Sequence, residues 1–81
     1  MENLNIQFTH AVTGRVQFRK DEMKNRFKIS KFRSDKDFNV KISLQGLDDG
    51  DWTAFMDWEY NNQLFMLERH FTMLNENMEP L

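Results

Sequence analysis

The chain of 81 residues contains no cysteine, one proline, three isolated glycines and two histidines. The absence of cysteine excludes disulfides, thiolate metal sites and a thiol nucleophile. The isolated glycines exclude a glycine-rich loop that would bind phosphate. No apolar run approaches the roughly 18 residues of a transmembrane helix, and the start, MENLNIQF, lacks the features of a signal peptide. We therefore expect a soluble protein segment in which residues 1–81 form a single domain.

Few side chains are available for catalysis. His10 lies in a predicted loop and His70 on a predicted strand, and no Ser/His/Asp spacing of a nucleophilic triad recurs. The acidic turn 48–51 lacks the register of an EF-hand. Six methionines and two histidines suggest soft Cu(I) as an alternative, but His70 and Met73 fall on opposite faces of a strand. The sequence therefore predicts no enzyme, no catalytic residue and no metal or cofactor site.

Alternation of apolar and polar residues with a period of two is the dominant pattern, and it predicts strands. The first two apolar sets, in 4–8 and 16–18, predict a hairpin over 4–19. Phe27 and Ile29 continue the core alternation, and Phe32 falls out of phase, which indicates a bulge near Ser30-Lys31. The clearest strand has apolar residues at 38, 40, 42 and 44.

The segment 51–71, DWTAFMDWEYNNQLFMLERHF, predicts a second hairpin that turns at Asn61-Asn62, because Asn tolerates positive φ. A helix over 52–74 is the rival interpretation, and Thr53, the aromatic residues and the Asn-Asn pair argue against it. On the hairpin, one face carries the large core residues Trp52, Met56, Trp58, Phe65, Leu67 and Phe71. Phe55 is the aromatic residue left on the opposite face, which makes it the first candidate for a partner contact.

Together these strands predict an all-β domain with turns every 8–12 residues, either an antiparallel sandwich or a small barrel. We expect its core to span 3–74 and its C-terminal tail, 75–81, to be frayed.

The net charge of −2 conceals an asymmetry between the halves. Residues 1–41 carry ten Lys and Arg against five Asp and Glu, a net +5, and residues 42–81 carry one Arg against eight acids, a net −7. The charges either interlace across neighbouring strands or form a basic face for an acidic partner. A third interpretation is that the Lys-rich segment 24–36 protects a sheet edge against pairing.

Basic residues interleaved with aromatic residues are also typical of single-strand nucleic-acid binders. Val16, Phe18, Phe27 and Ile29 alternate like core residues, however, so nucleic acid is a less favoured partner than protein. The candidate partner-binding residues are Phe55, Arg19, Lys28, Lys31 and Arg33.

The pattern FTHAVTGRVQFRK, then NRFKI, GLDDGDW and FMDWEYNNQLFMLER, resembles the soluble domain of FixH-like proteins over residues 4–73. Its marker positions are Thr13-Gly14, Arg19, Leu47/Gly50/Trp52, Asp57-Trp58, Phe65 and Glu68. Lys20-Asp21 depart from the family, which tends to have Pro-Ser there. The resemblance implies an immunoglobulin-like antiparallel sandwich of about six or seven strands.

The resemblance also implies a non-catalytic accessory role, through protein–protein contact, in assembling a cbb-type haem–copper oxidase. The partners would be the membrane oxidase or components of a copper-exporting ATPase. The domain would lie on the outer, periplasmic side of the cytoplasmic membrane, held only by an upstream anchor, whereas a native start at Met1 would make it cytoplasmic. The alternative is a small stand-alone β-module whose basic face binds nucleic acid or an acidic protein.

Overall fold

The computed structural model describes residues 3–75 and 77–80, without the side chains of 23–26 and 80. This part of the chain forms seven strands: β1 (Asn3–Gln7), β2 (Thr13–Lys20), β3 (Met23–Arg33), β4 (Asn39–Ser43), β5 (Gly50–Tyr60), β6 (Gln63–Leu74) and β7 (Asn77–Pro80). A search of the same residues finds no helix of the length and apolar character needed to cross a membrane.

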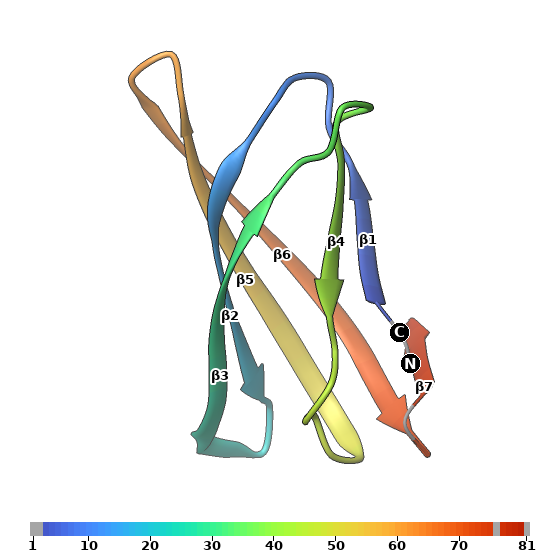
Figure 1. The fold of residues 1–81 in the computed structure, drawn as a ribbon. Helices are drawn as coiled ribbons and strands as arrows, with labels where there is room; N and C mark the ends of the chain where they lie inside the picture. The colour runs from blue at the N-terminus through green and yellow to red at the C-terminus, as the bar shows by residue number, and fades with distance from the viewer. Residues whose placement is uncertain (1–2, 76, 81) are drawn as a thin grey trace.

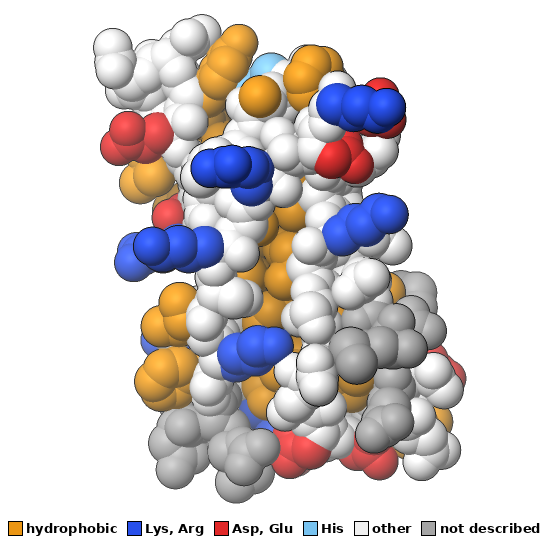
Figure 2. Space-filling view, viewed as in Figure 1, with side chains coloured by type: hydrophobic (Ala, Val, Ile, Leu, Met, Phe, Trp, Pro, Cys, Tyr) orange, Lys and Arg blue, Asp and Glu red, His pale blue; other side chains and the backbone are white. Residues whose placement is uncertain are grey.

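The strands form two antiparallel sheets that pack face to face (Figure 1). The larger sheet has the order β3-β2-β5-β6-β7, and the smaller consists of β1 and β4. The predicted small antiparallel sandwich of six or seven strands is confirmed. From the side on which β3 and β4 face each other, a strip of apolar side chains shows between the two strands, with Lys and Arg on either side (Figure 2).

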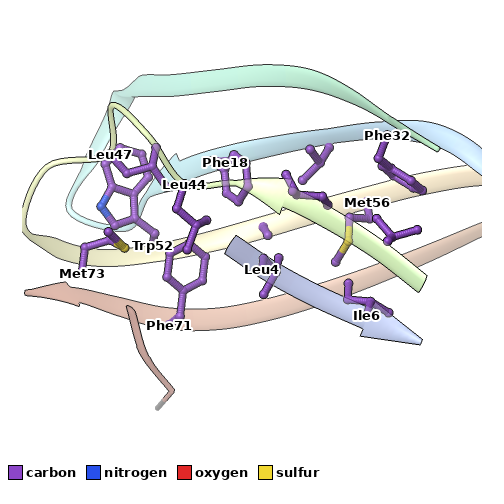
Figure 3. Close-up of a cluster of buried hydrophobic side chains, with 14 of the residues drawn as sticks. Leu4, Ile6, Phe18, Phe32, Leu44, Leu47, Trp52, Met56, Phe71 and Met73 are labelled. Atoms are coloured by element: carbon purple, nitrogen blue, oxygen red, sulfur yellow. The ribbon is translucent and has the colours of Figure 1, made fainter. Parts of the chain in front are cut away.

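The core lies between the two sheets and is built from both. Its buried members are Leu4, Ile6, Val12, Val16, Phe18, Phe32, Val40, Ile42, Leu44, Leu47, Trp52, Ala54, Met56, Phe71 and Met73. In Figure 3, Leu4 and Ile6 of β1 lie over the strands that carry Met56 and Phe71. The rings of Phe18 and Phe71 meet edge to face, with centroids 6.0 Å apart. Each fully buried side chain of this size contributes about 1.5–3 kcal/mol, which offsets the short length of the chain.

The predicted hairpin over 4–19 is wrong, because β1 and β2 belong to different sheets. β1 pairs with β4, with Leu4 opposite Ile42 and Ile6 opposite Val40. The segment between β1 and β2 crosses from one layer to the other, where β2 lies between β3 and β5. A hairpin would place the apolar residues of β1 and β2 side by side in one layer, and the sandwich needs them in opposing layers.

The expected core phase of β3 is also wrong. Phe27 and Ile29 are 56% and 57% exposed, and Phe32 is buried. Phe32 lies opposite Gly14, whose missing side chain leaves room for the ring, and this pairing sets the phase of the strand. The register shifts between Arg19 and Lys20, which pair with Phe27 and Met23 of β3, and not near Ser30-Lys31.

Two strand ends also differ from expectation. Phe38 precedes β4, has a positive φ of 66° and is 38% exposed. The strand predicted from the apolar residues 38, 40, 42 and 44 therefore begins too early, because Phe38 belongs to the turn before it. In the tail, Asn77–Pro80 forms β7 and pairs with β6, so the expected fraying is wrong there. Residues 76 and 81 lie outside the described part of the chain.

The hairpin of β5 and β6 is confirmed, with no helix in this segment. Tyr60 pairs with Gln63 across Asn61 and Asn62, whose φ values of 53° and 60° are those of a type I′ turn. The end of the hairpin projects beyond the smaller sheet (Figure 1). For this reason Trp58 and Leu67 are only partly buried, and Phe65, predicted in the core, is 38% exposed.

Candidate functional site

The face of the five-stranded sheet that points away from β1 and β4 carries the candidate site, and we call it the outer face. Side chains alternate between the two sides of a strand, and residues directly opposite in register share a side. The pairing therefore assigns to the outer face residues 13, 15, 17 and 19 of β2, 27, 29, 31 and 33 of β3, 51, 53, 55, 57 and 59 of β5, and 64, 66, 68, 70 and 72 of β6.

A hollow of about 470 Å³ lies near the middle of the outer face. Phe55, partly buried, provides its aromatic wall, and Ile29 and Met66 provide apolar walls from β3 and β6. The full lining is Arg15, Gln17, Arg19, Ile29, Phe55, Asp57 and Met66. The hollow thus combines an apolar centre with charged groups of both signs.

Large apolar side chains are exposed around this hollow. Ile29 and Phe27 stand on β3, and Leu64 and Met66, 65% and 73% exposed, stand on β6. Single exposed apolar residues are normal on a protein surface, but four on one sheet face next to a hollow indicate an interaction site.

Charge on the outer face is sorted by strand. β2 and β3 present Arg15, Arg19, Lys31 and Arg33, whereas β5 and β6 present Asp51, Asp57, Glu59 and Glu68. In the described part of the chain one ion pair crosses the boundary, with Nε of Arg15 lying 3.1 Å from Oδ2 of Asp57. Among the described side chains Lys31, Arg33 and Glu59 form no ion pair.

The predicted interlacing of charge between the two halves of the sequence is confirmed in part. Charges interlace at Arg15–Asp57 and also at the end of the sheet, where Nζ of Lys20 lies 3.3 Å from Oδ2 of Asp48. The remaining cations form a basic strip on β2 and β3. β3 is an edge strand, as expected if its lysines protect an edge.

The structure brings four of the five predicted partner-binding residues together. Phe55, Arg19, Lys31 and Arg33 all lie on the outer face, and the guanidinium carbon of Arg19 lies 6.0 Å from the centroid of the Phe55 ring, a cation–π contact. Lys28 does not join them. It lies opposite Phe18 on the inner side of the sheet, and its Nζ donates a hydrogen bond to the carbonyl oxygen of Gln45 at 2.8 Å.

Sequence reasoning missed Arg15, Ile29 and Met66 as members of this surface. Arg15 has the same strand parity as Arg19, and this signal was sufficient to find it. Met66 has the parity opposite to the core residues Phe65 and Leu67, which is also readable from the sequence. Ile29 was assigned to the core, and only the pairing of β3 with Gly14 reveals its true side.

A polar cluster lies beside the hollow on the same face. The hydroxyl of the buried Thr53 donates to Oδ1 of Asp21 at 2.7 Å, and it lies 2.9 Å from Nδ1 of His70. Met73, the other residue of the copper alternative, is buried on the opposite side of the sheet from His70. A search of the described residues finds no group of three His, Asp or Glu placed to hold a metal ion. The cluster's hydrogen bonds tie the loop after β2 to β5 and β6.

Comparison of the chain with protein-family models, curated proteins and solved structures gave no match.

Proposed function

We propose that this domain is a non-catalytic accessory module that acts by protein–protein contact through its outer face. The observation that carries the proposal is the hollow walled by Phe55, Ile29 and Met66 and bordered by Arg15 and Arg19. Aromatic and Arg side chains around an apolar centre are the composition that protein interfaces favour.

The acidic residues of the outer face argue for a protein partner over a nucleic acid. A phosphate backbone that followed the basic strip of β2 and β3 would pass within one or two strands of Asp57, Glu59 and Glu68. Asp57 and Glu59 on β5 lie one strand from β2, about 4.8 Å away and within the ~8 Å Debye length at physiological salt, so these two carboxylates would oppose binding. A protein surface carries both signs of charge and can match both halves of the face.

The narrower form of the proposal follows the resemblance to FixH-like proteins. In that form the domain serves the assembly of a cbb-type oxidase, and its partner is a subunit of the oxidase or of the copper-exporting ATPase. A pull-down from native membranes tests this form by the recovery of those subunits, and their absence contradicts it.

Site-specific photo-crosslinking tests the broader form. A photoreactive amino acid replaces Ile29 on the outer face, and the matched control replaces Lys41, an exposed residue of β4 on the smaller sheet. We expect protein crosslinks in the native cell from position 29 and few from position 41. Equal crosslinking from both positions contradicts the proposal, and so does a salt-dependent shift of nucleic acid without protein crosslinks.

A further inference from the structure

We propose that the outer face binds the outer face of a second copy of this chain, about a two-fold axis that runs along the strands. This inference rests on the proposed function, because it names a partner for the same surface. It is carried by the sorting of charge between the two halves of the face.

The two halves of the outer face are complementary to each other. The outer positions of β2 and β3 hold four cations and no acid, and those of β5 and β6 hold four acids and no Lys or Arg. Among the side chains that the structure describes, only Arg15 and Asp57 neutralise each other across the boundary between these strands. The described face is thus close to neutral as a whole but strongly polarised, which is the property of a surface that fits its own copy.

Symmetry decides how two copies can meet. Sheets that pack face to face keep their strands nearly aligned, so a two-fold axis in the interface runs either along or across the strands. An axis across the strands places each strand over its own copy, cation over cation. An axis along the strands, between β2 and β5, places the basic half of one copy over the acidic half of the other. The charges therefore select the second arrangement.

The exposed apolar side chains are spread over both halves of the face. Ile29 and Phe27 lie in the basic half, and Phe55, Met66 and Leu64 lie in the acidic half. Rotation about this axis keeps each residue at its level along the strands, so Ile29 and Phe27 face Glu68 and His70 of β6 in the other copy. Met66 and Leu64 face Lys31 and Arg33 of the other copy. Phe55, beside the boundary, lies close to the axis, so both copies of this ring enter the centre of the interface, where energetically important residues gather.

The size of the face sets the strength of the association. Four strands about 4.8 Å apart, with about seven residues each at about 3.4 Å, cover roughly 450 Å² of flat area per copy. Two copies together bury about 900 Å² by this measure, below the ~1,200 Å² at which stable interfaces begin. We therefore expect a weak dimer that forms reversibly as concentration rises.

Analytical ultracentrifugation of the full chain over a concentration series, up to about 1 mM, measures this association. Two double variants test its geometry: Lys31→Glu with Arg33→Glu, and Glu59→Lys with Glu68→Lys. Each variant alone should self-associate at least about tenfold more weakly, because the altered half then has no net charge and its attraction to the facing half is lost at both contacts of the dimer. An equimolar mixture of the two variants should recover association. Lys41→Glu, on the smaller sheet, is the matched control and should leave the wild-type constant unchanged, and circular dichroism confirms that each variant is folded.

Each result bears on the inference. A wild-type chain that stays monomeric throughout the series overturns it, and so does a mixture of variants that associates no better than its components. Photo-crosslinks from position 29 to a different protein, with a monomeric wild-type chain, overturn the inference and leave the proposed function standing. Dimerisation that the mixture restores supports it.

Discussion

Gly14→Ala should destabilise the domain, although glycine-to-alanine changes in strands ordinarily do the reverse. Gly14 does not have positive φ, so alanine fits its backbone conformation and would normally add about 0.4–1 kcal/mol of stability. The obstacle is space. A Cβ at this position would lie 2.8 Å from Cζ of Phe32 and 2.9 Å from Cβ of Trp58, and it would overlap the carbonyl oxygen of Asp57.

The magnitude follows from what must move. Real Cβ contacts essentially never fall below 3.0 Å, and the Asp57 oxygen belongs to the backbone of β5, which pairs with β2 beside this position. Because the backbone cannot turn aside as a side chain can, we expect the upper range of overpacking costs, about 3 kcal/mol. For a domain of this size the melting temperature should fall by roughly 12–24 °C.

Thermal unfolding followed by circular dichroism measures this change. Thr13→Ala, at the exposed neighbouring residue on β2, is the matched control and should cost less than about 1 kcal/mol. Phe32→Leu in the Gly14→Ala background should recover part of the loss, because it removes one of the contacting atoms. A Gly14→Ala domain as stable as the wild type would refute the reasoning, since the close pairing of β2 and β5 would then be wrong.

Two further changes test the turn and the polar cluster. Asn62→Ala should lower the free energy of unfolding by about 1 kcal/mol because its φ is 60°, whereas Asn62→Gly should leave it unchanged or raise it; equal thermal shifts for the two would contradict the type I′ turn. Thr53→Val should cost about 0.5–1.5 kcal/mol in urea unfolding, because Asp21 and His70 are exposed and regain hydrogen bonds to water; a loss above about 3 kcal/mol would show that the hydroxyl has a larger structural role.

The sequence predicted the strands well because alternation is a local property. The faces of Trp52, Met56 and Phe71 and the turn at Asn61-Asn62 followed from spacing and from the backbone preference of Asn. Strand partners did not follow, since alternation describes a strand but not its neighbour. The pairing of β1 with β4 instead of β2 depends on which apolar faces must oppose each other in the complete sandwich.

The candidate site was predictable to the same extent. Phe55, Arg19 and Lys31 reached the correct face because their parity is opposite to that of residues that are buried. Lys28 was predicted on the binding surface and Ile29 in the core, and the structure shows the reverse. The cause is a contact between strands, because Phe32 fills the space over Gly14 and thereby sets the phase of β3. The prediction of the site therefore failed on β3, because the side of the sheet that each β3 residue faces depends on the absence of a side chain at Gly14 of β2.

The pairing of β1 with β4 has a consequence for the order of folding. All of β2 and β3 lies between these strands along the chain, whereas the β5–β6 hairpin closes across two residues. Closing the longer loop costs more chain entropy, so the hairpin should form early and β1 should dock late. Leu4 and Ile6 then reach the core only in this final step. Until it occurs, the inner side of the five-stranded sheet stays open, and the folding chain passes through a stage in which aggregation competes with completion.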